Sequence, residues 1–500
     1  MTSGLLTANP AEQTRGAARG GLANIAGSAL AGGVGVVVTW IVARRLGPAE
    51  AGAFFSATAA FVLAGGLAKL GTGTGLVYWP ARLRATGRDH LLGACLRTGI
   101  LPVVGLSLVL ALAMGIAGSG GHRDALRMLA VFLPLQVLTD TLLTATRGYR
   151  SMRPTVLVDR VTRNVLQLLT VGAAALWFPS LPALALAWAV PYLPAAVLAG
   201  LAARRVHLTG RPAGATSRRA ERRALRREFW LFTGPRALAA VAQLALQRVD
   251  VLLVAALGGL GAAAVYAVAG RFVILIQFAN QGISQSVQPR LAEALSTGDR
   301  DTANRLYQVA TGWLVLITWP ISLLVILLAP YYLRFFGPGY AAGTPVVRLL
   351  AVAMLVATGC GMVDMVLAMA GRTSLNLGNV LVALAVTIGL DVLLIPRWGA
   401  LGAAAGLAGA MVANNLLPLV QVYRGARLHP FGPGTRAAAL LAAGCFGVLP
   451  WAVTTLAGGG PAGLALATAV AVPAFAGGAW LLRDRLELGA FTRRNPQEAS

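Results

Sequence analysis

The sequence predicts an all-α fold: a polytopic membrane protein of about fourteen transmembrane helices, in two pseudo-symmetric six-helix bundles plus two C-terminal helices. Three observations predict it. Hydrophobic residues make up 57% of the chain and charged residues only 12%. Apolar stretches recur from about Gly21 to Leu482, each near the roughly 20 residues with which a helix crosses a hydrocarbon core of about 30 Å. One stretch of the first half also recurs in the second half.

Short polar breaks separate the stretches, and almost nothing is left over for a soluble domain. The first stretch lacks a small-residue cleavage site after a short core and is followed by Arg44 and Arg45, so we interpret it as a retained helix rather than a signal peptide. In chain order, the expected spans are 21–43, 53–79, 91–117, 125–146, 155–178, 181–203, 229–257, 262–288, 306–335, 343–370, 374–396, 398–423, 437–457 and 461–482.

These spans divide the chain into successive parts. We expect a cytoplasmic tail (1–20), an N-terminal six-helix bundle (21–203), a basic cytoplasmic linker (204–228), a C-terminal six-helix bundle (229–425), two extra transmembrane helices (426–483) and a second cytoplasmic tail (484–500).

Arginine is distributed unevenly among the polar breaks. Cytoplasmic loops of membrane proteins are enriched in lysine and arginine, so both termini are expected in the cytoplasm. The same bias explains the formal net charge of +25 without nucleic-acid binding, for which the sequence has no motif. With the amino terminus inside, the outer breaks hold only Arg44, Arg45, Arg123, Arg334, Arg348 and Arg397.

The densest basic run is RRAERRALRRE, residues 218–228. It is most simply a linker that faces solvent or lipid headgroups. Docking of a partner protein on this run is the alternative.

Metal, thiol and P-loop chemistry find no support in the sequence. The three cysteines, Cys95, Cys360 and Cys445, are far apart in apolar stretches, and no spacing of histidines or cysteines matches a metal site. The sole lysine, Lys69, lies in LAKLGTG within an expected span, without the glycine spacing of a P-loop. We therefore expect no bound cofactor and no structural metal.

An internal repeat links the two halves. RRLGPAEAGAFFSATAAFV, from Arg44, aligns without gaps to AALGGLGAAAVYAVAGRFV, from Ala255. Both copies occupy the outer turn between the first and second helix of a six-helix set. Repeated bundles of this kind are found in transporters that hold the substrate at the bundle interface and rock around it.

Polar residues within the spans mark the candidate cavity, because charges in hydrocarbon are costly and usually face protein or water. Steps of seven, four and three residues place Arg236, Gln243, Gln247 and Asp250 on one face of the seventh span, while Arg248 points elsewhere. The eighth span carries a similar polar stripe that includes Gln277 and Gln281, with Arg271 off that stripe. The alternative is that the amides join helix to helix and that Asp250 pairs with Arg248 or another arginine.

The other spans contain isolated charges. Asp159 and Arg163 are four residues apart, which suits an ion pair within one helix. Lys69 either reaches the substrate or snorkels to the cytoplasmic surface. Asp364 and Asp391, together with Asp250, are candidates to bind a coupling sodium ion or proton, although lone acids near helix ends more often cap or pair.

Four segments together resemble a known family. They are RRLGPAEAGAFFSATAAFV, PRALAAVAQLALQRVDVLLVAALGGLGAAAVYAVAGRF, VQPRLAEALSTGDRDTANRLY and IPRWGALGAAAGLAGAM. In this order they resemble the polysaccharide transporter branch of the multidrug/oligosaccharidyl-lipid/polysaccharide exporter superfamily, which also includes the lipid II flippases. The resemblance extends from about Gly21 to Gly425. It implies a flippase that moves an undecaprenyl-diphosphate-linked oligosaccharide, or a related glycolipid, across the bacterial cytoplasmic membrane by alternating access.

The diphosphate of such a lipid needs cations along its path, and Lys69, Arg236, Arg248 and Arg271 are the candidates within the spans. Arg271 lies close to where lipid II flippases carry an arginine at the start of the eighth helix. The several first-helix arginines of those flippases have no match here, which favours another polysaccharide precursor over lipid II. The enzymes that make and polymerise the glycolipid are the expected protein partners.

Two other classes compete with this hypothesis. A drug or organic-cation exporter would prefer acidic cavity residues such as Asp250, and the excess of cations within the spans argues against it. A membrane-embedded enzyme acting on sugars would need a sizeable outer loop with acids, but the expected outer loops are short and nearly free of carboxylates.

Overall fold

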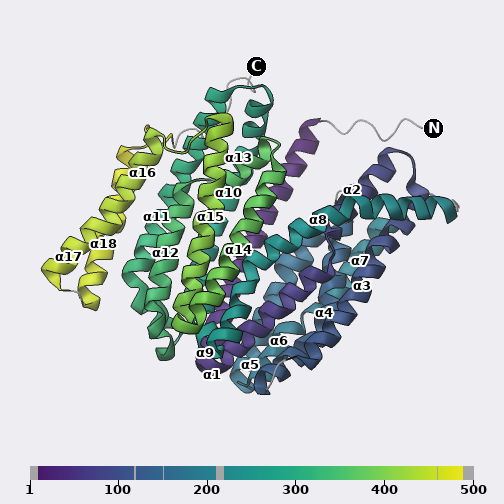
Figure 1. Ribbon diagram of the computed structural model, residues 1–500, viewed down its shortest axis with the longest axis horizontal. Coiled ribbons are helices and arrows are strands. Elements are labelled where there is room, and N and C mark those ends of the chain that lie inside the picture. The colour runs from purple at the N-terminus through teal and green to yellow at the C-terminus, as the bar shows by residue number, and fades with distance from the viewer. Residues whose placement is uncertain (1–9, 118–119, 150, 210–218, 459, 488–500) are drawn as a thin grey trace. The chain divides into compact units, whose positions relative to one another are not determined.

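The computed structural model describes residues 10–117, 120–149, 151–209, 219–458 and 460–487. Over these ranges the chain is helical, with no strand (Figure 1). Twelve of the described helices are long and apolar enough to cross a membrane, so the predicted all-α membrane fold is confirmed. Both predicted tails and the predicted linker lie partly outside the described residues.

The predicted number of fourteen spans differs from twelve for two identifiable reasons. The segment Ala26–Ala85 covers two predicted spans, because two helices meet at a kink at Gly47, whose φ of 71° is not helical, and are counted together as one. The predicted span 155–178 is not among the twelve. It begins with the π-helical stretch Thr155–Thr162, which contains two charged residues, and continues as α5 (Arg163–Trp177). The number fourteen stays a prediction.

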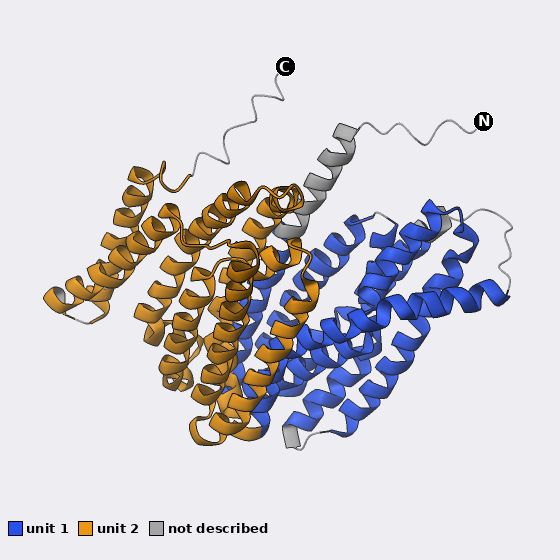
Figure 2. Ribbon diagram, turned by 45° about the horizontal axis from the view of Figure 1, so that its top comes forward, with its two compact units in different colours: residues 1–256 blue, residues 257–500 orange. Residues whose placement is uncertain are grey.

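The chain forms two compact units, Met1–Ala256 and Leu257–Ser500 (Figure 2). Unit 1 is built from eight labelled helices, which are α1 (Pro10–Ala68), α2 (Thr72–Ala85), α3 (Leu92–Ile116), α4 (Gly120–Gly148), α5, α6 (Leu181–Ala189), α7 (Tyr192–Thr209) and α8 (Arg219–Leu253). Helix α4 packs against α1, α2, α3, α6 and α7, and α8 packs against α1, α2 and α3. The basic run that was expected to be a linker is helical from Arg219 onward and continues directly into the seventh predicted span.

Unit 2 contains the other ten labelled helices. They are α9 (Leu260–Ala269), α10 (Val273–Ser296), α11 (Arg300–Phe336), α12 (Thr344–Gly359), α13 (Val363–Met369), α14 (Thr373–Trp398), α15 (Ala400–Ala426), α16 (Pro433–Ala443), α17 (Leu449–Ala457) and α18 (Pro461–Leu481). Helices α14 and α15 form an antiparallel pair, and α11 packs against α10, α12 and α16. Short 3-10 or π-helical stretches join several of these helices at Val254–Gly258, Gly270–Phe272, Pro338–Gly343 and Gly444–Val448.

Glycines allow α8 to pack closely on the α1–α2 segment of unit 1. A Cβ atom on Gly71 would lie 2.6 Å from the Cα of Ala237, and one on Gly75 would lie 2.9 Å from the Phe229 ring. A Cβ on Gly66 would overlap Leu244. Small residues at such positions let helix backbones approach in membrane proteins. Helix α1 ends at Ala68, and Gly71, with a φ of 68°, precedes the first residue of α2, so a turn that includes Lys69 interrupts the second predicted span.

The tenth predicted span is also broken in the structure. Helix α12 ends at Gly359 and α13 begins at Val363, with Gly361 at a φ of 71° between them. The hydroxyl of Tyr307, which is 1% exposed, donates a hydrogen bond of 2.6 Å to the carbonyl oxygen of Cys360. This bond satisfies a carbonyl group that the break removes from the helical pattern.

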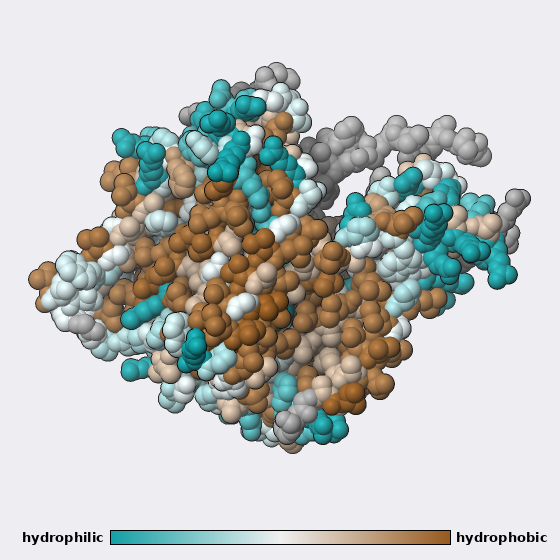
Figure 3. Space-filling view, in the orientation of Figure 1, coloured by the Kyte–Doolittle hydropathy of each residue, from teal (hydrophilic) through white to brown (hydrophobic). Residues whose placement is uncertain are grey.

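The distribution of hydropathy on the surface agrees with a membrane environment. Figure 3 shows hydrophobic residues along the lengths of the helices and hydrophilic residues gathered toward helix ends. Large apolar side chains are widely exposed, among them Leu112 at 74% and Leu440 at 75%. In water such surfaces would promote association, whereas in a bilayer they contact lipid.

Candidate functional site

The predicted polar stripe on α8 faces outward over most of its length. Arg236, Gln243 and Gln247 are exposed, whereas Asp250 is only 5% exposed. One carboxylate oxygen of Asp250 accepts a hydrogen bond of 2.8 Å from the backbone N–H of Val251. The accessible part of the stripe therefore carries one cation and two amides, and its single acid is buried.

Arg236 belongs to a layered cluster of arginines and aromatic rings. Its guanidinium lies 3.8 Å from the centroid of the Phe232 ring and donates a 2.8 Å hydrogen bond to the Phe232 carbonyl. The Phe232 ring stacks on Tyr78 of α2, with centroids 4.2 Å apart and planes 16° apart. Arg82 donates a 2.9 Å hydrogen bond to the Tyr78 hydroxyl. We refer to Tyr78, Arg82, Phe232 and Arg236 as the arginine–aromatic cluster.

Three members of this cluster, Tyr78, Arg82 and Phe232, were not predicted as site residues, although their spacing in the sequence indicates the contacts within each helix. Tyr78 and Arg82 are four residues apart, and so are Phe232 and Arg236, which brings each arginine beside its ring on one helix face. The pairing of the two helices could not be read from the sequence. It depends on the close packing of α8 against α2 at Gly75.

Lys69 is engaged in an ion pair. Its Nζ atom lies 2.9 Å from Oδ2 of Asp140 on α4, and the two side chains are 36% and 26% exposed. The pair places a cation beside the turn at Gly71, which packs on Ala237 next to Arg236. The positive charge of Lys69 is thus balanced by a carboxylate that remains partly accessible.

The expected ion pair within one helix is confirmed. Arg163 Nε donates to Asp159 Oδ1 over 3.0 Å, and Arg160 Nε lies 3.6 Å from Asp159 Oδ2. The Arg163 guanidinium also lies 5.1 Å from the centroid of the Tyr192 ring. These contacts connect the π-helical start of this segment to α7, so Asp159 and Arg163 act as a structural link in unit 1.

Arg248 faces a different side of α8 from the stripe. It is half-buried, and its Nε atom is buried without a hydrogen-bond partner among the described residues. A buried guanidinium N–H that lacks an acceptor is costly. This position can therefore accept an anionic or polar group from outside the chain.

In unit 2 the predicted residues occupy α10 and the turn before it. Arg271 lies in the 3-10 turn Gly270–Phe272 between α9 and α10 and is half-buried. Gln277 and Gln281 are exposed on α10, and Asn280 and Gln288 are exposed on the same side of the helix. A membrane-length helix with an exposed amide stripe is expected to face water or polar groups rather than lipid.

Two acids of unit 2 were candidates for ion coupling. Asp391 is buried, and Asp364 is half-buried. Asp364, in the first turn of α13, accepts a 3.5 Å hydrogen bond from Asn414 through Oδ2, and its Oδ1 has no hydrogen-bond partner among the described residues. Asp391 on α14 is 0% exposed and lies against Gly406 of α15. No group of three or more histidine, cysteine or acidic side chains suitable for a metal ion occurs in the part of the chain that the structure describes.

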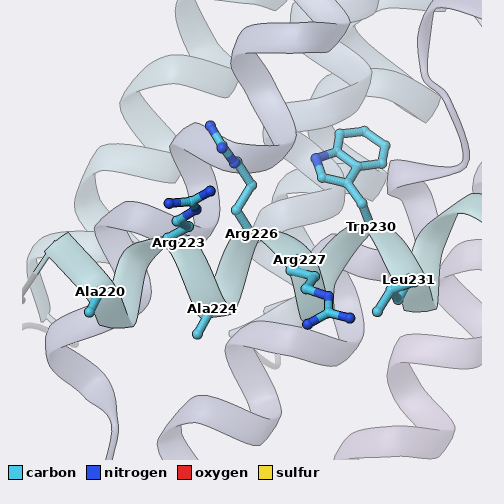
Figure 4. Close-up of a pocket in the computed structure, with 7 residues that line it drawn as sticks. All are labelled: Ala220, Arg223, Ala224, Arg226, Arg227, Trp230 and Leu231. Carbon is cyan, nitrogen blue, oxygen red and sulfur yellow. The ribbon is translucent and has the colours of Figure 1, made fainter.

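The basic start of α8 forms an open depression on the surface of unit 1, with a volume of about 710 Å³ (Figure 4). All of the described residues that line it come from α8, and among them Arg223, Arg226 and Arg227 supply its charge. Trp230 and Leu231 follow on the same helix. The depression therefore combines guanidinium groups with exposed apolar surface, as in segments that lie at lipid headgroups.

Comparison with known families and structures gives consistent matches. The sequence matches the family described as Polysaccharide biosynthesis protein over residues 17–295, more than half of the chain, and the MatE family over residues 235–396. None of the curated proteins matches the sequence.

Solved structures match at low sequence identity. The inward closed conformation of the lipid II flippase MurJ aligns with a TM-score of 0.69 and 13% identity, covering 93% of this chain and 99% of that one. An inward-facing multidrug resistance MATE transporter of the MOP superfamily aligns with a TM-score of 0.61 and 14% identity, covering 81% and 94%. A MOP superfamily transporter from Pyrococcus furiosus, described as having a binding pocket of reverse polarity, aligns with a TM-score of 0.51 and 16% identity, covering 82% and 94%. These neighbours are transporters or flippases, not enzymes.

Proposed function

Because the chain belongs to the polysaccharide biosynthesis protein family and has the fold of MOP superfamily membrane transporters, we propose that it is a flippase for a polyprenyl-diphosphate-linked oligosaccharide. The substrate is a precursor of a polysaccharide, moved across the bacterial cytoplasmic membrane by alternating access. Both termini lie in the cytoplasm, and the enzymes that assemble and polymerise the glycolipid are its partners.

The polarity of the exposed face of α8 carries the proposal. Along this face the accessible groups are Arg236, Gln243 and Gln247, and the only acid of the stripe, Asp250, is buried. An anionic diphosphate is stabilised by guanidinium and amide donors, whereas an organic cation would need an accessible carboxylate. The balance of charge thus favours an anionic substrate over a cationic drug.

The arginine–aromatic cluster suits the junction of a diphosphate and a sugar. Arginine binds phosphate oxygens through paired N–H donors, and exposed aromatic faces offer apolar surface to sugar rings. Arg82 and Arg236 flank the stacked rings of Tyr78 and Phe232, so both kinds of surface occur within one cluster. Lys69, Arg248 and Arg271 are the further cations, and Gln277 and Gln281 the further amide donors, that we assign to the path.

An ion gradient is a second part of the proposal. Asp250, Asp364 and Asp391 are the groups that we assign to coupling by sodium ions or protons. Asn414 lies beside Asp364, and the side-chain oxygens Asp364 Oδ1 and Asn414 Oδ1 have no hydrogen-bond partner among the described residues, which supports a role for this acid in binding a cation. Asp364 and Asp391 lie in unit 2, whereas the arginine–aromatic cluster lies in unit 1, so ion binding at these two acids and diphosphate binding can be tested separately.

Flipping in proteoliposomes tests the proposal. A fluorescent undecaprenyl-diphosphate oligosaccharide is placed in both leaflets, and its accessibility to an impermeant quencher or lectin is followed with time. We expect Arg236→Ala to slow flipping at least tenfold, since one charge-assisted phosphate contact contributes about 1.5–3 kcal/mol. Arg227→Ala is the matched control, because residue 227 lies nine residues earlier on the same helix, which is two and a half turns from Arg236 and therefore on the opposite face.

The outcomes separate the candidate substrates. Flipping that fails in folded Arg236→Ala and persists in Arg227→Ala supports the diphosphate site. Flipping of lipid II in preference to other glycolipids would assign the chain to peptidoglycan precursors instead. Uptake of small organic cations without any lipid flipping would reject the proposal in favour of a cation-coupled multidrug exporter, and Asp250 would then be the residue to study.

A further inference from the structure

A second cavity lies in unit 2 and is lined by none of the stripe residues described above. It has a volume of about 220 Å³ and is formed where the last turns of α10 meet the first turns of α11. Arg290 of α10 and Arg305 of α11 line it, together with the hydroxyl groups of Ser286 and Thr302. The indole of Trp313 and aliphatic side chains form its apolar part.

A carboxylate of the chain itself already occupies part of this cavity. The Glu487 carboxylate receives hydrogen bonds from the Arg305 guanidinium, with distances of 3.2 Å from Nη2 to each oxygen and 3.3 Å from Nε to Oε1. Arg290 makes no ion pair with any described residue. Two arginines and one carboxylate therefore line the cavity, so its described lining carries a net positive charge.

Contacts of the neighbouring residue Leu486 fix the segment that carries Glu487. The indole N–H of Trp313 donates a 2.9 Å hydrogen bond to the carbonyl of Leu486, and the Leu486 side chain is 3% exposed. Glu487 itself has a φ of 51°, in the left-handed region that is unfavourable for residues with a side chain. The backbone is thus fixed at Leu486, whereas the Glu487 carboxylate is held by its side-chain ion pair with Arg305, so the carboxylate can leave the cavity without detaching the segment.

We propose that this cavity binds the phosphate of an anionic phospholipid headgroup and that Glu487 competes with the lipid for Arg305. The carboxylate marks the place of the anion, and phosphate oxygens accept the same paired N–H donors. A lipid fits better than a soluble anion because Trp313, Val287 and Leu306 provide apolar surface beside the charges, at the ends of two membrane-length helices. Basic pockets between transmembrane helices at a membrane surface are suited to anionic headgroups.

Native mass spectrometry of the purified full-length protein tests the proposal, with phosphatidylglycerol added in steps and phosphatidylcholine as the neutral comparison. We expect Arg290→Ala and Arg305→Ala each to weaken binding of phosphatidylglycerol by about threefold to fivefold, as for loss of one partly exposed ion pair. Glu487→Gln keeps the size of the side chain and removes the competing charge, so it should strengthen binding by a similar factor. Arg300→Ala and Asp301→Asn alter exposed charges at the start of α11 outside the cavity and serve as matched controls.

Three results would overturn the proposal. The first is equal binding by Arg305→Ala and Arg300→Ala. The second is unchanged or weaker binding by Glu487→Gln. The third is competition by inorganic phosphate at concentrations equal to those of the lipid, which would assign the cavity to a soluble anion. Arg305→Lys is a control for a folding defect, because it keeps the positive charge but loses the paired N–H donors. It should bind phosphatidylglycerol with an affinity between those of the native protein and Arg305→Ala.

Discussion

Separating Lys69 from Asp140 should reveal how much their ion pair stabilises unit 1. At the observed 2.9 Å between Nζ and Oδ2, two unit charges attract by about 1.4 kcal/mol in bulk water and about 5.7 kcal/mol at an effective dielectric constant of about 20. The side chains are 36% and 26% exposed, so water screens part of this attraction. We expect a coupling energy of about 2 to 3 kcal/mol, between these two limits.

A double-mutant cycle measures this energy directly. Lys69→Met, Asp140→Asn and the double variant are unfolded in mixed micelles by titration with sodium dodecyl sulfate, and the free energy of unfolding is followed by tryptophan fluorescence. The Arg305–Glu487 pair provides the comparison, since its distance is 3.2 Å but its side chains are 71% and 33% exposed. We expect a coupling of no more than about 1 kcal/mol there.

The reasoning would be refuted if the coupling of Lys69 to Asp140 were no larger than that of Arg305 to Glu487. Flipping assays on the same variants separate stability from transport. Asp140→Asn leaves the lysine in place and should retain flipping, whereas Lys69→Met removes a cation from the proposed path and should slow it. Equal flipping by both variants would remove Lys69 from the substrate path while leaving its structural role intact.

Further predictions concern backbone packing, the broken helix and ion coupling. Gly71→Ala should lower the free energy of unfolding by about 2 to 5 kcal/mol, because the new Cβ meets the backbone of Ala237 and the residue keeps a φ of 68°. Gly73→Ala is its control, since nothing lies within 4 Å of a Cβ there, and an equal loss in both variants would contradict the argument. Tyr307→Phe should cost about 1 to 3 kcal/mol in the same titration by leaving the Cys360 carbonyl without its donor; an unchanged midpoint would show that another group replaces the hydroxyl. Flipping that depends on a sodium or proton gradient should lose that dependence when Asp250, Asp364 and Asp391 are replaced by asparagine, and gradient-driven flipping that survives all three changes would rule out coupling through these acids.

The fold class could be predicted from the sequence because apolar length and composition determine it almost alone. The interruptions within spans were missed, since a glycine in an apolar run does not reveal whether it adopts a positive φ. Gly71 and Gly361 both do so, and each lies where a neighbouring helix approaches closely. These turns depend on contacts between distant parts of the chain, which periodicity cannot supply.

Helical periodicity was more successful for the candidate site within single helices than between them. It correctly paired Asp159 with Arg163, whereas the separation of Arg248 from the stripe on α8 stays a prediction. It did not pair Lys69 with Asp140, because these residues come from different helices and are 71 positions apart. The arginine–aromatic cluster was not predicted either, because its two halves come from different helices, although each of its arginines lies beside a ring of its own helix.

The hydroxyl of Tyr307 gives the break between α12 and α13 a mechanical property. In a continuous helix, bending at one turn requires several backbone hydrogen bonds to lengthen together. At the break, the carbonyl of Cys360 is satisfied by a side chain instead, and rotation about the bonds of a single tyrosine can release it. The hydrogen bond from Tyr307 therefore contributes about 1 kcal/mol to the resistance of this joint to bending, and the packing of the buried residues Cys360, Met362 and Val363 adds to it, so side-chain contacts rather than a continuous backbone pattern join α12 to the acid-bearing helix α13.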